Sequence, residues 1–159
     1  MKMRYYLTAV VAVSLVGILS LSDTKPNLAQ AAAPASAKGQ AEPVEEDMHE
    51  FMEYVFQPTY KRLKQTMAAE PADSAAWKGI KSDGLILAEG GNLLLLRGPA
   101  ENAEAWAKHS TAVRQEGAKL YQAGKKKDFA AASASYRAML TNCNACHTEF
   151  ADGEHQLAP

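Results

Sequence analysis

The sequence predicts an all-α protein, an antiparallel up-down-up-down bundle of four helices. After residue 60, Ala, Leu, Lys, Glu and Gln are abundant while β-branched residues are sparse, and this bias favours helix. Apolar residues recur three and four positions apart in four separate stretches, which is the spacing of one helix face. The connections between these stretches are short, and short connections join antiparallel neighbours in a bundle.

The first helix is expected over residues 45–69. Its apolar positions are Met48, Phe51, Met52, Val55, Phe56, Leu63 and Met67. Three acidic residues at 45–47 suit the positive end of a helix dipole. Pro58 has no N–H to donate to the carbonyl of Tyr54, so we expect the helix to kink or break there.

The second helix is expected to begin at Asp73 or Ser74, both good capping residues. It should end at the strong breaker Gly98–Pro99. Residues 90–91 are both glycine, which is unfavourable inside a helix. This pair indicates either the close approach of a large flat ligand or a kink in the helix.

The third helix is expected from about Ala100 to about Gly124. The basic run 125–127 follows it and suits a solvated helix C-terminus, not a partner site. Asp128 then caps the fourth helix, whose apolar stripe runs from Phe129 to Phe150. Both cysteines of the chain belong to this last stripe.

The first 37 residues are typical of a secretory signal peptide followed by its cleavage region. A basic start is followed by an uncharged apolar run over residues 5–21, with small-residue sites at 29–31 and 35–37. We therefore expect export to the periplasm. If the segment were left uncleaved, the apolar run would instead anchor the chain in a membrane.

The remaining chain divides into a linker at residues 38–43, a helical domain at 44–152 and a tail at 153–159. Removal of the first 37 residues leaves 14 Lys and Arg against 17 Asp and Glu, a net charge of −3. This charge offers no basic footprint for nucleic acid.

The sequence CNACH at residues 143–147 carries the chemistry of the fourth helix. Residues three and four apart share a helix face, so Cys143, Cys146 and His147 point the same way. Two thiols at this spacing can form thioethers with the two vinyl groups of one haem, and the adjacent histidine can reach the iron. CxxCH is the attachment signature of c-type haem, so we predict one haem c per chain.

Three other interpretations of the motif are weaker. A zinc site needs about four ligands, and the remaining histidines, His49, His109 and His155, are expected to face solvent or lie in the tail. A redox dithiol expects a βαβ setting. A disulfide within one helical turn would be strained.

The position of the motif predicts where the haem pocket lies. In an antiparallel bundle, the end of the fourth helix is close to the start of the first, the end of the second and the start of the third. The pocket walls should therefore come from residues 48–56, 90–96 and 103–106.

The sequence resembles the cytochrome c-prime family over most of residues 44–152. Three features carry the resemblance: CNACH followed by Phe150, the segment Glu104–Ala105–Trp106 at the start of the third helix, and Glu46–Asp47 before the first. The resemblance implies a four-helix bundle with one covalent haem and His147 as the proximal iron ligand. It also implies Trp106 and the first helix as parts of the haem pocket.

The distal side of the iron is left with two alternatives. By the family pattern, Phe56 occupies the distal position, where an apolar side chain keeps the iron five-coordinate. Two positions depart from that pattern: Ala151 and Met52 stand where the family tends to have basic residues. Met52 is therefore a second candidate, as a sixth ligand, and Met48 is a weaker third.

These observations predict a c-type cytochrome that transfers electrons in the periplasm. The alternative is a five-coordinate haem protein that binds or senses nitric oxide or carbon monoxide. A haem enzyme is disfavoured because no His or Arg is evidently placed on the distal wall for acid–base work. The redox partner is not identified, although a negative chain favours a partner with a basic patch. The resemblance implies a homodimer as one assembly.

Overall fold

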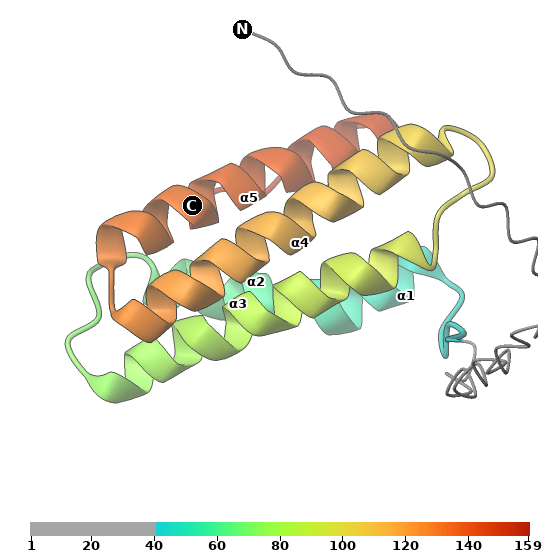
Figure 1. The fold of residues 1–159 in the computed structure, drawn as a ribbon. Coiled ribbons are helices and arrows are strands. Elements are labelled where there is room, and N and C mark those ends of the chain that lie inside the picture. The colour runs from blue at the N-terminus through green and yellow to red at the C-terminus, as the bar shows by residue number, and fades with distance from the viewer. Residues whose placement is uncertain (1–40) are drawn as a thin grey trace, which may run out of the picture. The chain divides into compact units, whose positions relative to one another are not determined.

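The computed structural model describes residues 41–159, so the expected signal segment at 1–37 lies outside the described residues. All regular structure in the described part of the chain is helical, arranged as a bundle (Figure 1). The helical bundle expected from the sequence is therefore confirmed. Among the described residues, no helix is long and apolar enough to cross a membrane.

The first helical segment consists of three consecutive pieces: α1 (Met48–Phe51), the π-helix η1 (Met52–Phe56) and α2 (Gln57–Thr66). Asp47 caps it, because its side chain accepts a hydrogen bond from the backbone N–H of Glu50 at 3.0 Å. The segment is shorter than the predicted 45–69, because Asp47 is the first residue whose carbonyl accepts a helical hydrogen bond, from the N–H of Phe51.

The π-helical turn replaces the kink or break expected at Pro58. The N–H of Gln57 donates to the carbonyl of Met52, five residues back, and Pro58 lies at the start of the α-helix that follows. A proline is tolerated there because the first helical N–H groups have no intrahelical partner. The wider turn also brings the rings of Phe51 and Phe56 to 5.6 Å, edge to face.

The other three helices are α3 (Ser74–Leu95), α4 (Ala103–Lys126) and α5 (Phe129–Phe150). The predicted caps are confirmed: the side chain of Asp73 accepts from a backbone N–H of α3, and that of Asp128 does so for α5. The start of α3 and both ends of α5 fall where they were predicted, while the end of α3 and both ends of α4 differ by two to three residues.

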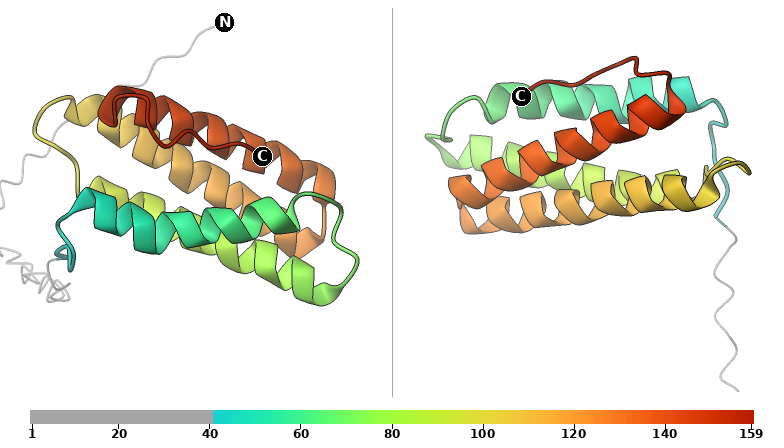
Figure 2. Two further views of the ribbon diagram at one scale, coloured as in Figure 1. Left: turned by 180° about the vertical axis from the view of Figure 1, so that it is seen from behind. Right: turned by 90° about the horizontal axis from the view of Figure 1, so that it is seen from above.

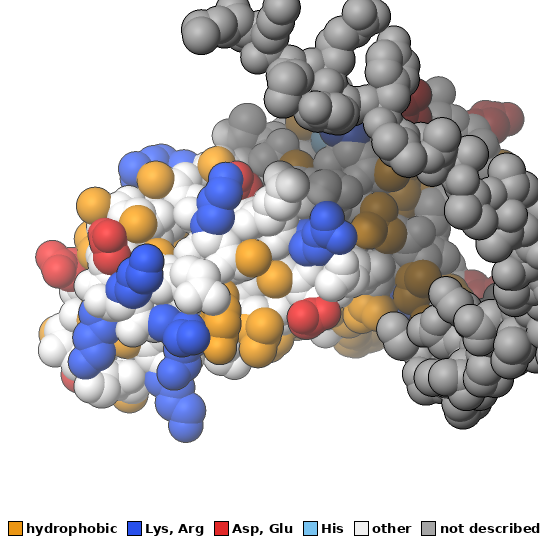
Figure 3. Space-filling model, viewed as in Figure 1, with side chains coloured by type: hydrophobic (Ala, Val, Ile, Leu, Met, Phe, Trp, Pro, Cys, Tyr) orange, Lys and Arg blue, Asp and Glu red, His pale blue; other side chains and the backbone are white. Residues whose placement is uncertain are grey.

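The basic run at residues 125–127 is confirmed as an exposed helix end. Lys125 and Lys126 complete the last turn of α4, and Lys127 ends it in the left-handed conformation with φ of 56°. Figure 3 shows Lys and Arg side chains gathered over that end of the bundle, at the left of the view. Cations at a helix C-terminus are favoured by the helix dipole.

Glycines bring α3 and α4 together more closely than any side chain would permit. A Cβ atom on Gly91 would lie 2.6 Å from the backbone N of Arg114, and one on Gly117 would lie 2.5 Å from that of Ala88. As the residue number rises along α3 it falls along α4, so these two helices run in opposite directions. We name this contact the glycine seam.

The seam revises our interpretation of the glycine pair at 90–91. Gly91 meets the backbone of α4, whereas a Cβ on Gly90 would lie 2.8 Å from the ring tip of Phe56. Close protein packing therefore accounts for both residues, and α3 continues through them without a break. Glycine permits such an approach because it has no Cβ.

The helix α5 packs along α4 but stands away from the first helical segment. No Cα atom of α5 lies within 8 Å of a Cα atom in α1, η1 or α2. At the far end, side chains bridge this separation: Leu63 and Met67 belong to one buried cluster with Tyr136 and Met139. Nearer the end of α5 the separation opens into a cavity.

The glycine seam makes a testable prediction about stability. Replacing Gly117 with Ala should lower the free energy of unfolding by about 1–3 kcal/mol, because the new methyl group must push two helix backbones apart. Gly79→Ala is the matched control, since a Cβ at that position of α3 meets no atom within 4 Å.

Denaturant unfolding monitored by helix circular dichroism would measure both variants. The control should be stabilised by up to about 1 kcal/mol, from the better helix propensity of alanine. Equal effects of the two substitutions would contradict the close approach of α3 and α4.

Candidate functional site

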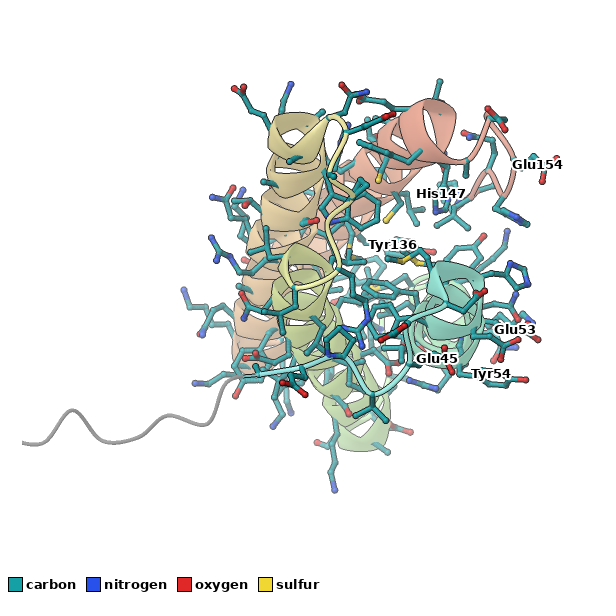
Figure 4. All side chains as sticks on the ribbon, turned by 90° about the vertical axis from the view of Figure 1, so that its right-hand side faces the viewer. Glu45, Glu53, Tyr54, Tyr136, His147 and Glu154 are labelled. Carbon is teal, nitrogen blue, oxygen red and sulfur yellow. The ribbon has the colours of Figure 1, made fainter. Side chains whose placement is uncertain are left out.

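The candidate site is a cavity of about 510 Å³ between the first helical segment and α5. This volume falls within the range of about 300–1,000 Å³ that holds organic ligands in proteins. The lining is mainly apolar and comes from all six helical elements and the residues after α5. Figure 4 shows His147 and Tyr136 on the side of α5 that faces the first segment, while Tyr54 projects away into solvent.

All three chemical groups of the CNACH motif line this one cavity. Cys143, Cys146 and His147 lie in the last two turns of α5, each partly buried, and both thiols are free. The shared face predicted from their spacing is therefore confirmed. It follows from the helix repeat, which places residues three and four apart on one side.

Both candidates for the opposite side of the site lie on the cavity wall. Met52 and Phe56 are the first and last residues of the π turn, both are partly buried, and both line the cavity, as does Met48 one turn earlier. Counting in α-helical turns placed Met52 one turn before Phe56. A π turn contains one residue more than an α-helical turn, so the two side chains are not directly above one another on the helix surface.

The predicted walls are confirmed in part. Trp106 is 6% exposed, and its indole N–H donates to the carbonyl of Leu94 at 2.8 Å. Its ring meets that of Phe150 edge to face at 5.1 Å. Trp106 and Leu94 line the cavity, whereas the rest of residues 90–96 do not. The predicted second wall is therefore narrower than expected.

The histidines lie differently from what the sequence indicated. His109 was expected at the surface, but its side chain is only 12% exposed, lines the cavity and pairs with Glu149 at 3.1 Å. This expectation was wrong because α4 turns His109 toward the ring of Phe150, 6.3 Å away. His49 is 68% exposed, as expected, and stands at the cavity rim.

Tyr136, two turns before the motif on α5, was not predicted as a site residue. Tyr136 is 4% exposed, lines the cavity, and its hydroxyl has no hydrogen-bond partner among residues 41–159. Burial raises the pKa of this hydroxyl to about 12, so it stays a neutral donor. A buried hydroxyl without a partner costs free energy, and a ligand oxygen in the cavity would relieve that cost. Its place in the apolar stripe with Cys143 and His147 was the available signal.

Burial also sets the ionisation of the motif. Loss of solvation raises the pKa of Cys143 to about 12, and the neighbouring Cys146 adds to this. Burial likewise raises the pKa of Cys146 to about 11, with Glu149 contributing. Burial lowers the pKa of His147, which favours the neutral imidazole that can bind a metal.

These residues fit a haem held by two thioethers and one imidazole. Two thiols and an imidazole face a largely apolar cavity, and one unpaired hydroxyl projects from its wall. Among residues 41–159, no cluster of three or more His, Cys, Asp or Glu side chains is arranged to hold a metal ion. Comparison with protein-family models, with curated proteins and with solved structures gives no match for this chain. A function for this chain is therefore inferred from its sequence and from the geometry of its site.

The thiol pKa values make a prediction for the haem-free chain. Since the thiolate is the reactive form, iodoacetamide should alkylate both cysteines far more slowly at pH 8 than it alkylates a free cysteine. Cys146 should react about tenfold faster than Cys143, because its pKa is about one unit lower.

Both rates should rise about tenfold for each pH unit up to about pH 11, because the thiolate fraction of each cysteine grows in that proportion while the pH stays below its pKa. Peptide mass spectrometry after timed alkylation would follow each cysteine separately. Alkylation of Cys143 at pH 8 at the rate of a model peptide would contradict the buried environment.

Proposed function

We propose that this protein is an exported c-type cytochrome that transfers electrons in the periplasm through one covalent haem. The observation that carries the proposal is the convergence of Cys143, Cys146 and His147 on one cavity. The haem c would be held by thioethers to the two cysteines, with His147 as the proximal ligand. The resemblance to cytochromes c-prime agrees with this, including an antiparallel up-down-up-down order of the helices.

The bound haem would supply a one-electron couple between ferrous and ferric iron, and the residues of this chain would set its environment. Phe56 and Trp106 provide apolar walls, which exclude water and favour a buried redox centre. Tyr136 offers one hydroxyl to an oxygen within the cavity. The proposal assigns no catalytic residue and no enzyme activity, and it gives His109 a packing role on the wall beside Phe150, where Glu149 pairs with it.

The alternative function is binding or sensing of a small gas such as nitric oxide or carbon monoxide. The observation that favours it is Phe56, whose ring packs against Gly90 and Phe51 on the cavity wall. A phenyl ring cannot ligate iron, so Phe56 in the distal position would leave the sixth coordination site open. Met52, on the same wall, would instead close that site.

The proposal includes export, a protein redox partner and a homodimer as one possible assembly. Export follows from the signal pattern of the first 37 residues, and an uncleaved signal would tether the bundle to a membrane. The net charge of −3 after cleavage favours a redox partner with a basic patch.

Covalent attachment is the first test. When the full chain is expressed with a haem-attachment system, the denatured protein should have the mass of the polypeptide plus one haem. Replacing Cys143 and Cys146 together with Ala should remove this added mass, because no thiol remains for a thioether. The matched control Asn142→Ala alters a neighbouring residue of α5 outside the cavity and should retain it. An unmodified wild-type chain would reject the proposal.

The spectrum of the reduced protein distinguishes electron transfer with a closed site from gas binding. A high-spin ferrous spectrum that shifts on adding carbon monoxide supports the open site behind Phe56. A low-spin spectrum that ignores carbon monoxide supports a sixth ligand on the first segment. In that case Met52→Leu should make the haem responsive, whereas Met48→Leu should not.

A further inference from the structure

The residues after α5 turn back toward α2 (Figure 2). Three of them, His155, Gln156 and Leu157, line the cavity. We name residues 152–158 the strap. It turns through left-handed backbone at Asp152, Gly153 and His155, with φ of 49°, 79° and 57°. At non-glycine residues this conformation costs about 1–2 kcal/mol. Such backbone persists only where surrounding contacts hold it.

The contact that matters to the motif is made by the backbone of the strap. The carbonyl oxygen of His155 lies 2.9 Å from Nδ1 of His147. A carbonyl oxygen can only accept, so Nδ1 carries the proton and Nε2 keeps its lone pair. The N–H of Gly153 also donates to the carbonyl of His147 at 3.0 Å, which ties the turn to the end of α5.

Two anchors on different helices hold the strap in place. On α5, the Asn144 side chain donates to the carbonyl of Leu157 at 2.9 Å and accepts from its N–H at 2.7 Å. On α2, the Tyr60 hydroxyl donates to the carbonyl of Ala158 at 2.7 Å and accepts from its N–H at 3.2 Å. The Leu157 side chain packs against the buried cluster between the anchors. Asn144 lies between the two cysteines, at a position for which attachment chemistry needs no particular residue.

We propose that the strap is a positioning element for His147. It fixes the ring as the Nδ1–H tautomer with Nε2 free. Asn144, a residue of the motif itself, holds the strap through its two hydrogen bonds to Leu157. The inference rests on the proposed function, since the free Nε2 would face the iron. An imidazole that donates from its second nitrogen is a more basic ligand. More basic ligation favours ferric iron, so the strap should lower the reduction potential.

The anchors provide the variants that test the strap. Asn144→Ala and Tyr60→Phe each remove two hydrogen bonds to it from opposite sides. Asn142→Ala is the matched control, because that side chain donates only to Ala138 within α5. Hydrogen exchange followed by mass spectrometry should show the amides of residues 152–158 exchanging about tenfold faster in the two anchor variants, and unchanged in the control.

The reduction potential of the haem-loaded proteins tests what the strap does. Both anchor variants should have a higher potential than the wild type, while Asn142→Ala should match it. A loosened strap with an unchanged potential would overturn the positioning role. Unchanged exchange in both anchor variants would show that these side chains do not hold the strap.

A haem-free chain separates the failure of the inference from that of the proposed function. In the Cys143→Ala, Cys146→Ala double variant, nitrogen NMR of the His147 ring should show the Nδ1–H tautomer. Adding Asn144→Ala should shift the ring toward a mixture of tautomers. If the wild type carries no haem but this shift is seen, the proposed function fails, while the positioning of His147 by the strap is supported. If haem is attached and no shift is seen, the inference alone fails.

Discussion

The close contact of α3 with α4 is the constraint on which the rest of the bundle depends. Gly91 and Gly117 let the two backbones meet where a Cβ would collide. This pair forms a two-helix layer, with α5 lying on α4 and the first helical segment lying on α3. Because each outer helix follows its own partner, the separation between the outer helices is decided by what lies between them. At one end this is a cluster of side chains, and at the other it is the cavity.

The cavity end is organised by an irregular turn rather than by a regular helix. The π turn ending at Phe56 inserts an extra residue just before Pro58, where a continuous α-helix would lose a hydrogen bond. Such turns are frequent at functional sites because they change which residues face inward. Here Met52 and Phe56 both reach the cavity wall. Under the proposed function, the choice between an open and a methionine-ligated iron would therefore depend on this turn.

The wall of the cavity that carries residues 143–147 is held by more contacts than the CNACH sequence alone indicates. The helix repeat alone places Cys143, Cys146 and His147 on one face. The orientation of the imidazole depends in addition on the hydrogen bond that its Nδ1 atom makes. The carbonyl of His155 supplies the partner for that nitrogen. Ligand geometry at a metal is commonly set by such outer contacts. In this chain the outer contact comes from a segment that returns across the bundle after its last helix.

The sequence by itself determined the helical class, the capping residues Asp73 and Asp128, and the shared face of the motif. These are local properties, set by capping, propensity and the 3.6-residue repeat. Only the tertiary structure decided the burial of His109, the orphan hydroxyl of Tyr136, and the role of the glycine pair at 90–91. It also decided the path of the strap, which depends on Tyr60 of α2 meeting Ala158, 98 residues further along the chain. Contacts between separate helices leave no periodic trace in a sequence, because they depend on the packing of every element at once.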